Sequence, residues 1–248
     1  ITIDSDNVNL DLNGKTISQG NSTAGVSAVV VDSSHSGILV GNGSITGMTS
    51  SGVVLNDSSS DIQLHKIIAE GNGEYGLTAT LIEDLVIENS AFNQNTDSGV
   101  LISSSNRVCI LSTISNDNGG DGFELMGTSN TYLIDGSKAF ENTMIGFHLS
   151  NILDSVLQNS IAIANGGDGI LLENSSDVTI TVVAAPIANE APVAVATANH
   201  LTGEAPFNID FTGSNSTDDK GIVSYQWNFQ AGTSSEANTS YTFTNPGN

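Results

Sequence analysis

The chain has 248 residues, which suits one long domain or two short ones. It carries 27 acidic residues against 5 Lys plus Arg, so its formal net charge is −22. So few cations cannot neutralise a phosphate backbone, which excludes nucleic acid as a partner and disfavours binding to an anionic membrane. Hydrophobic residues make up 38%, enough to fill a core, and no apolar run approaches the ~20 residues of a membrane span. This acidity suits a neutral or cationic partner.

The first three quarters of the chain form an internal repeat. Its unit is Asn-x-x-x-Gly followed by a short apolar strand, with Met48 replacing the asparagine once. The repeat glycines, at spacings of 27, 24, 23, 23, 24 and 23, are Gly25, Gly52, Gly76, Gly99, Gly122, Gly146 and Gly169. A fixed period of this length indicates a solenoid, in which each unit buries its apolar face against its neighbours.

Apolar residues stand one and three positions after each repeat glycine. The first column is Val26, Val53, Leu77, Val100, Phe123, Phe147 and Ile170, and the second is Ala28, Leu55, Ala79, Ile102, Leu125, Leu149 and Leu172. The position between them is mixed, and a period of two with one apolar face predicts strands with one buried side. A unit of 23 residues holds about three strands and three turns, which predicts about seven stacked coils.

The repeat asparagines are Asn21, Asn72, Asn95, Asn118, Asn142 and Asn165. Asparagine tolerates the left-handed backbone angles of a tight corner, and stacked asparagines can also hydrogen-bond from coil to coil. We therefore expect these residues to form a structural ladder. The alternative is a row of amides that binds a ligand.

Three segments resemble the right-handed parallel β-helix repeat proteins, the pectate-lyase-like and NosD-like superfamily. They are the opening Asn-Val-Asn-Leu-Asp-Leu-Asn-Gly-Lys-Thr-Ile-Ser (residues 7–18) and the repeats at 118–125 and 165–172. The resemblance covers residues 1–183. It implies an all-β fold, a single-stranded right-handed parallel β-helix, in a secreted or cell-surface protein. It does not decide the activity, because the fold hosts lyases, hydrolases, epimerases, adhesins and inert stalks.

The repeat ends and the composition changes after residue 183. Residues 184–191 contain Pro186 in a stretch of small residues, which predicts a linker. Residues 192–248 resemble the polycystic-kidney-disease (PKD) type immunoglobulin-like module, through Ser224-Tyr-Gln-Trp-Asn-Phe229 and Tyr241-Thr-Phe243. The resemblance implies a β-sandwich, and the family's final valine-rich strand is lacking, so we expect a C-terminally incomplete module. The acidic turn at Asp218 and Asp219 is a candidate Ca²⁺ site, with a plain surface turn as the alternative.

Candidate catalytic residues in the repeat region are few. Asn95-Thr-Asp97 is similar to an element of the polygalacturonases, and Asp121 precedes the next repeat glycine, so these two aspartates are expected on adjacent coils. Two close carboxylates can divide acid and base roles. His148 is the nearest histidine, and it falls in register with Glu124, with which it could form an ion pair. The other polygalacturonase elements are missing, and no spacing of histidine or cysteine predicts a metal site.

The sequence favours a non-catalytic extracellular or cell-surface repeat protein with a structural, adhesive or glycan-contacting role. One alternative is a polysaccharide-active enzyme, a glycoside hydrolase or lyase, using Asp97, Asp121 or His148. Another is a filament or surface-assembly subunit that stacks through the ends of the solenoid. The expected partners are a polysaccharide, another surface protein or a second copy of the chain. No cofactor is expected apart from the possible Ca²⁺.

Overall fold

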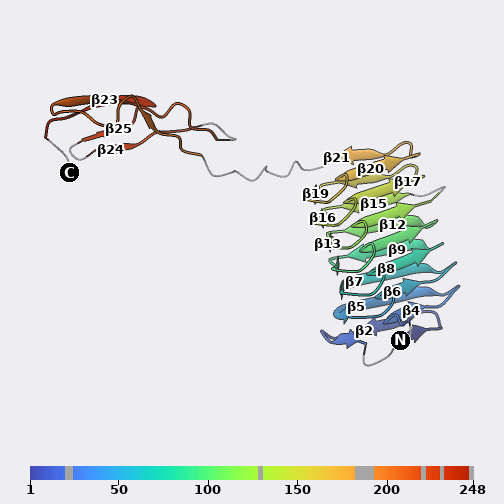
Figure 1. Cartoon of the computed structure of the whole chain (residues 1–248). Helices are drawn as coiled ribbons and strands as arrows, with labels where there is room; N and C mark the ends of the chain where they lie inside the picture. Colours follow the sequence, from blue (N-terminus) through green and yellow to red (C-terminus); the bar gives the residue numbers. More distant parts are fainter. Residues whose placement is uncertain (20–24, 128–130, 182–192, 219–221, 230–231, 246–248) are drawn as a thin grey trace. The chain divides into compact units, whose positions relative to one another are not determined.

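The structure, a computed structural model, describes residues 1–19, 25–127, 131–181, 193–218, 222–229 and 232–245. All regular secondary structure in these residues is β-strand, and none of them forms a helix able to cross a membrane. The chain forms two compact units, Ile1–Ala185 and Pro186–Asn248 (Figure 1). The expected linker at 184–191 lies outside the described residues.

The first unit is a parallel β-helix, which confirms the predicted fold class (Figure 1). One strand of each coil joins an eight-stranded parallel sheet, here called sheet A, through which neighbouring coils pair in register. Its strands, in spatial order, are β1 (Thr2–Ile3), β4 (Val29–Val31), β6 (Val53–Leu55), β8 (Leu77–Thr80), β11 (Val100–Ser103), β14 (Phe123–Met126), β17 (Phe147–Ser150) and β20 (Ile170–Glu173).

The other two strands of each coil belong to a 13-stranded sheet, here called sheet B. In β5 (Ser36–Thr46) and β7 (Ser60–Glu70) these two strands are continuous, and in the later coils they are separate. The other members are β2 (Asn9–Asp11), β3 (Thr16–Ser18), β9 (Glu83–Glu88), β10 (Ala91–Asn93), β12 (Asn106–Leu111), β13 (Ile114–Asn116), β15 (Tyr132–Asp135), β16 (Lys138–Phe140), β18 (Val156–Gln158), β19 (Ile161–Ile163) and β21 (Thr179–Thr181). About seven coils result, stacked ~4.8 Å apart.

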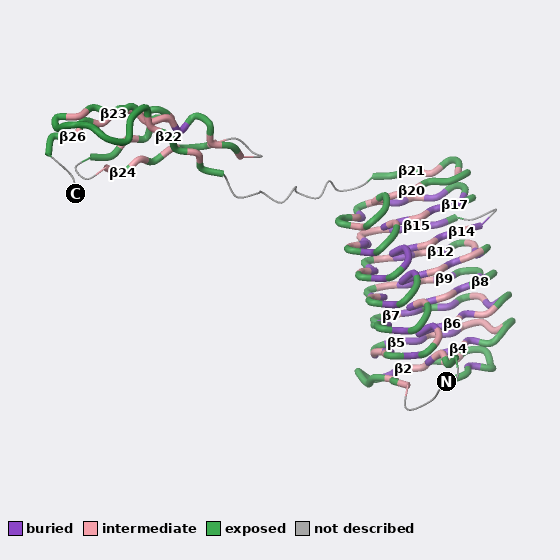
Figure 2. Tube along the Cα trace, viewed as in Figure 1, coloured by how far each residue is buried: buried purple, intermediate pink, exposed green. Residues whose placement is uncertain are grey.

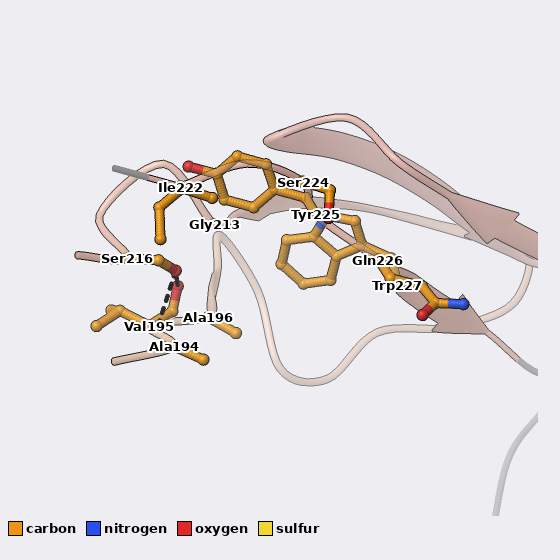
Figure 3. Close-up of a pocket in the computed structure, with 10 residues that line it drawn as sticks. All are labelled: Ala194, Val195, Ala196, Gly213, Ser216, Ile222, Ser224, Tyr225, Gln226 and Trp227. Carbon is orange, nitrogen blue, oxygen red and sulfur yellow. Dashed lines mark hydrogen bonds between the residues drawn. The ribbon is translucent and has the colours of Figure 1, made fainter. Parts of the chain in front are cut away.

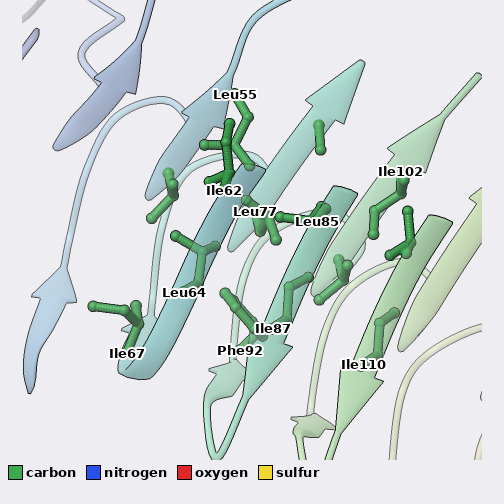
Figure 4. Close-up of a cluster of buried hydrophobic side chains, with 14 of the residues drawn as sticks. Leu55, Ile62, Leu64, Ile67, Leu77, Leu85, Ile87, Phe92, Ile102 and Ile110 are labelled. Carbon is green, nitrogen blue, oxygen red and sulfur yellow. The ribbon is translucent and has the colours of Figure 1, made fainter. Parts of the chain in front are cut away.

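The two predicted apolar columns fill the interior of the coils (Figures 2 and 4). Val100, Phe123 and Phe147 are fully buried, and the rings of Phe123 and Phe147 stack with centroids 4.9 Å apart. The same columns are less buried at β20, the last strand of sheet A among the described residues, where Ile170 is half-buried and Leu172 is 40% exposed. Burial of the core therefore depends on a neighbour on each side, as expected for a solenoid.

The second coil, which begins with β4, has a different register from the one predicted. Val29, not Val26, pairs with Val53, and Val26 is 38% exposed. The position equivalent to the glycine at 52 is therefore Ala28, whose N–H donates to the Gly52 carbonyl. The spacing of 27 residues between Gly25 and Gly52 reflects extra residues in this coil. The spacing of the glycines alone therefore placed the apolar columns three residues too early.

The repeat asparagines form a continuous buried ladder. Each side-chain amide donates to the side-chain oxygen of the asparagine in the next coil, at 2.9 Å from Asn72 to Asn95, 3.0 Å from Asn95 to Asn118, and 2.9 Å from Asn118 to Asn142 and from Asn142 to Asn165. The same oxygens accept backbone N–H groups, as between Asn95 and Asn118 at 3.0 Å. Asn21 lies outside the described residues.

At the corners of each coil, residues other than the repeat asparagines adopt the left-handed backbone conformation. In one coil the residues with positive φ are Ser104, Arg107, Ser112 and Asp117, with φ between 49° and 55°, while Asn118 is not among them. The residue before each ladder asparagine makes the turn, and the asparagine points inward. The expectation that asparagine occupies these positions for its left-handed backbone is wrong, and its amide is the reason for the repeat.

The repeat glycine is required by the next coil, including its ladder amide. A Cβ added at Gly122 would lie 2.7 Å from the Gly146 carbonyl oxygen and 2.8 Å from the Asn142 amide nitrogen. One at Gly99 would lie 2.7 Å from the Asn118 amide nitrogen and closer still to Ser115 Oγ. Each asparagine amide thus occupies the space over the glycine of the preceding coil. Where the next coil supplies Met48 in place of asparagine, the glycine is replaced by Ala28.

The second unit contains two small antiparallel sheets. One is β22 (Thr197–Ala198), β23 (Phe207–Thr212) and β26 (Asn238–Phe243), and the other is β24 (Trp227–Phe229) and β25 (Gly232–Ser234). Phe211, Trp227, Phe229 and Tyr241 form a chain of ring contacts between them. Among the described residues of this unit, Ile209 is the one hydrophobic side chain that is buried.

Replacing Asn118 by alanine tests the ladder. The substitution leaves the buried N–H groups of Asn95 without their acceptor, so we expect the free energy of unfolding to fall by roughly 2–5 kcal/mol. Urea denaturation followed by circular dichroism measures this loss. Gln63→Ala, at an exposed position of β7, is the control and should change stability by less than about 0.5 kcal/mol; equal losses would show that the ladder is not a main source of stability.

Candidate functional site

The outward face of sheet A changes from apolar to polar along the solenoid. The outward positions in the middle of successive strands are Val54, Thr78, Leu101, Glu124 and His148. Next to the last two of these, the turns that enter sheet A supply Tyr75, Asp97, Ser98 and Asp121. This group, together with Glu173 at the end of β20, is here called the acid–histidine row.

His148 joins three successive coils. Its Nδ1 lies 2.9 Å from Asp121 Oδ2, and its Nε2 lies 3.3 Å from Glu173 Oε2. Burial by itself would lower the pKa of His148, but the hydrogen bonds to Asp121 and then Glu173 outweigh it, so the pKa is raised. Asp121 is only 5% exposed and also accepts the Ile145 N–H at 2.8 Å. The imidazole is therefore held in a fixed orientation.

Glu124 is the most desolvated carboxyl of the row with a resolved shift. Burial raises its pKa above the ordinary range, a hydrogen bond from Ser98 Oγ at 2.9 Å opposes this rise, and the charges of Asp121 and Asp97 add to it. Burial disfavours the charged form of a carboxyl group. Glu124 therefore holds its proton to a higher pH than a solvated glutamate does.

Tyr75 extends the row by one coil. Burial, the charge of Asp97 and a hydrogen bond with Asp97 raise its pKa to about 12. Its hydroxyl is therefore a neutral hydrogen-bonding group at physiological pH. Asp97 itself is exposed and accepts the Ser98 N–H at 3.0 Å.

The structure places the three predicted residues, Asp97, Asp121 and His148, in one row, but in an arrangement that differs from the sequence expectation. Asp121 is in register with Ser98 rather than with Asp97, since the Asp121 N–H donates to Ser98 Oγ at 3.1 Å. Glu124 and His148 are in register, as predicted. The ion pairs of His148, however, are to Asp121 and Glu173, so the expected pairing with Glu124 is wrong.

Tyr75 and Glu173 were missed because no sequence signal singles them out. Each is an unremarkable member of its repeat, and only the stacking of coils 23 to 27 residues apart brings them to the row. A register alignment of outward positions shows the polar change at Glu124 and His148. It does not show which acid each of them contacts.

Cations lie elsewhere in the β-helix. Its four Lys and Arg residues, Lys15, Lys66, Arg107 and Lys138, all fall outside sheet A. Arg107 is not simply solvated: it bridges coils through 2.6 Å contacts to Glu83 and Asp84. The hydrogen bond from Arg107 lowers the pKa of Asp84. Among the described residues of sheet A, His148 is the one side chain that can carry a positive charge beside the acids of the row.

The described residues contain no group of three or more His, Cys, Asp or Glu able to hold a metal ion. Asp219, half of the candidate Ca²⁺ turn, lies outside the described residues, so the structure adds nothing to that candidate. In the β-helix, Cys109 lies between two buried neighbours on β12 and is partly exposed, and burial raises the pKa of its thiol.

The second unit contains a half-open hollow of about 300 Å³ that the sequence did not reveal (Figure 3). Tyr225, Trp227 and Ile222 line one side, and Val195 and its alanine neighbours line another. Its lining is mainly apolar, and Ser216 is engaged with the backbone of Val195.

Comparisons with known proteins agree with both units. Residues 2–132 and 83–183 match the model of the right-handed β-helix region, and residues 189–248 match that of the PKD domain. The chain therefore belongs to the right-handed β-helix family and carries a PKD-type module at its C-terminal side. A search of curated protein sequences finds no match.

Two solved structures share the β-helix fold. The A-module of the Azotobacter vinelandii mannuronan C-5 epimerase AlgE4 is 19% identical, with a TM-score of 0.60 over 73% of this chain and 56% of that one. Pectate lyase Pel9A is 20% identical, with a TM-score of 0.53 over 64% of this chain and 46% of that one. The chain spans about half the length of each, and at these identities the likeness concerns the fold alone.

Replacing Glu124 by glutamine tests its environment. Because the pKa of Glu124 is raised in the folded protein, its neutral form favours folding below the ordinary value near pH 4.3, and this contribution is lost as pH rises through the raised value. We expect Glu124→Gln to be at least as stable as the native protein at neutral pH and to show a weaker loss of stability between acidic and neutral pH. Urea denaturation across this pH range measures the change in stability. The control is Glu70→Gln, at an exposed position of β7. A steeper loss in Glu124→Gln would contradict this account.

Proposed function

We propose that this member of the right-handed β-helix family is an extracellular protein that contacts glycans through the outward face of sheet A. The observation that carries the proposal is the acid–histidine row. Its side chains come from consecutive coils, and His148 joins Asp121 to Glu173 across three of them. The charged positions of the outward column are confined to one stretch, because Glu124 and His148 lie between Leu101 and Leu171.

The geometry suits an extended chain of repeating units. Consecutive coils lie ~4.8 Å apart, so a ligand lying along the stack meets Tyr75, Asp97, Glu124 and His148 on four successive coils. Carboxylates accept hydrogen bonds, and a tyrosine hydroxyl both donates and accepts them. Sugar hydroxyls are complementary to such a set, and side chains already held by neighbouring coils lose little freedom on binding.

The charge of the row selects the class of glycan. A uronate chain would bring its carboxylates to Asp97, Asp121, Glu124 and Glu173, and the described Lys and Arg residues of the β-helix lie off sheet A. Like charges brought together disfavour binding. We therefore propose a neutral or amino-sugar polysaccharide, in contrast to the mannuronan and pectate named for the two proteins of similar fold.

The proposed location rests on the two families. β-Helices like those of pectate lyases and PKD domains are typical of extracellular proteins. A long rigid solenoid followed by a second module also suits an adhesive or structural role, which needs binding without turnover. The non-catalytic reading is our first proposal.

A glycan panel tests this proposal. We expect isothermal titration calorimetry to detect binding of a neutral or amino-sugar polysaccharide, and we expect Asp121→Asn and His148→Gln each to weaken it about tenfold, because a charged hydrogen bond contributes roughly 1.5–3 kcal/mol. Asp135→Asn, on sheet B, is the matched control and should bind as the native protein does. Uronate binding that survives both substitutions in the row would refute the proposed face.

A second candidate function is hydrolysis of the bound glycan. The observation that favours it is the raised pKa of Glu124 beside the negative charges of Asp97 and Asp121. Two neighbouring carboxyl groups, one of them with a raised pKa, are an arrangement that glycosidases use. In this role Glu124 would donate its proton to the glycosidic oxygen as the C–O bond breaks, and Asp97 would take a proton from the water that attacks the anomeric carbon.

Product analysis separates the two functions. Incubation with the same panel should release no reducing ends and no unsaturated ends if the protein only binds. If reducing ends appear, Glu124→Gln should lower their rate by at least about a hundredfold, as expected for loss of a general acid, and Asp97→Ala should also lower it. Product that is unaffected by both substitutions would exclude this row as a catalytic site.

A further inference from the structure

His148 contacts two carboxylates that differ in their exposure to solvent. Its Nδ1 lies 2.9 Å from Oδ2 of Asp121, whose side chain is 7% exposed, and its Nε2 lies 3.3 Å from Oε2 of Glu173, whose side chain is 50% exposed. Asp121 is also held from a second direction, because its Oδ1 accepts the Ile145 N–H at 2.8 Å. The imidazole therefore stands between one carboxylate that is buried and fixed and another that can turn toward water.

Both contacts can be hydrogen bonds only while the ring is protonated. The imidazolium donates from both ring nitrogens, whereas the neutral imidazole has one N–H group and presents a lone pair on its other nitrogen. In the imidazolium form Nε2 is engaged with Glu173, so the ring offers no acceptor to a ligand.

The difference in burial decides which nitrogen of His148 loses its proton. A buried carboxylate without a donor carries a large desolvation penalty, while an exposed one can accept hydrogen bonds from water instead. The neutral ring therefore keeps its proton on Nδ1, toward Asp121, and has its lone pair on Nε2, toward Glu173. Because a lone pair and a carboxylate oxygen repel each other, the exposed side chain of Glu173 turns to solvent.

We infer that His148 gates the acid–histidine row: the imidazolium form closes the row, and loss of the Nε2 proton opens it to glycan hydroxyls. In the open form Nε2 and the carboxylate of Glu173 both accept hydrogen bonds, and a sugar hydroxyl can donate to either. The proton goes to solvent, and no covalent bond of the ligand changes. This inference rests on the proposed glycan-binding function, because it describes the regulation of the same face.

Acidic groups surround His148 on the elements that pack against it. Asp121 comes from the turn that enters β14, Glu124 lies in register on that strand, and Glu173 ends β20. Asp168 is exposed in the turn that enters β20. Burial would lower the pKa of His148, but the hydrogen bonds and charges of Asp121 and Glu173 outweigh burial and raise it. The closed form therefore persists to a higher pH than a solvated histidine would allow.

The pH dependence of the gate has one sign. A histidine whose pKa is raised in the folded protein is protonated below the ordinary value of about 6.5 and becomes neutral as pH rises through the raised value. If only the neutral form binds, the apparent affinity is reduced in proportion to the fraction of open molecules. Affinity for a neutral glycan therefore rises with pH, and it falls about tenfold for each pH unit below the pKa of His148.

NMR spectroscopy of the isotope-labelled chain tests the gate without a glycan. Long-range proton–nitrogen spectra report which ring nitrogen of a histidine is protonated, and the spectrum of His148→Gln assigns the signals of His148. We expect protons on both nitrogens at about pH 6 and a proton on Nδ1 alone at about pH 8.5. A neutral native ring that keeps its proton on Nε2 would overturn the gate.

Asp121→Asn should reverse the tautomer of the neutral ring. The Ile145 N–H requires an oxygen acceptor, so the new amide turns its NH₂ group toward Nδ1 of His148. The neutral ring then keeps its proton on Nε2, toward Glu173, and the row stays closed at both pH values. Asp135→Asn, on sheet B, is the control and should leave the native tautomer in place. The native tautomer in Asp121→Asn would also overturn the gate.

Isothermal titration calorimetry at the same two pH values relates the gate to binding. The probes are oligosaccharides of glucose and of N-acetylglucosamine, because neither carries a group that titrates in this range. We expect an affinity several-fold higher at the higher pH in the native protein and in His65→Gln, whose histidine lies on sheet B, and no such difference in His148→Gln. Glu124→Gln should retain the difference, because the titrating group is His148.

The outcomes separate the gate from the function on which it rests. Equal affinity at both pH values, or a pH dependence that survives in His148→Gln, overturns the gate and leaves the proposed glycan-binding face intact. Failure of both probes while another glycan of the panel binds overturns the gate as well. The absence of binding to every glycan overturns both proposals, even where the NMR spectra show the expected tautomer.

Discussion

The buried hydrogen bond between asparagine side chains of successive coils is the constraint on which the rest of the β-helix depends. It accounts for the asparagine, because each side-chain amide donates to the next coil while its oxygen accepts the amide and the backbone N–H of the previous one. It also restricts the glycine, because a Cβ at Gly99 or Gly122 would approach the amide as well as other nearby atoms. The ladder continues through steps of both 23 and 24 residues, so the coil length stays close to these values.

This constraint divides the residues of each coil into two kinds. Inward positions are determined by packing, so they repeat from coil to coil. Outward positions are free to vary, so any chemistry of the protein has to lie there. On sheet A the variation produces the acid–histidine row, in which Glu124 is desolvated and His148 is held between two carboxylates. Its acidity, with the Lys and Arg residues of the β-helix placed outside sheet A, is the reason that we propose a neutral or amino-sugar polysaccharide rather than a uronate chain.

Strong negative charge also shapes the contacts between coils. With a net charge of −22, the acids of neighbouring coils repel one another. Histidine and arginine side chains contact some of these acids across coils. His148 lies between Asp121 and Glu173. His65 contacts Glu88 in the next coil, and Arg107 contacts Glu83 and Asp84.

The sequence by itself determined the solenoid and most of the inward columns, because periodicity is a local property that repeats along the chain. It could not place the second coil correctly, since Ala28 takes the role of glycine there. It assigned the asparagines to corners, although neighbouring residues such as Asp117 make the turn. The partners of His148 were decided only by the tertiary structure, because Asp121 and Glu173 reach it from other coils and no local pattern selects between them and Glu124.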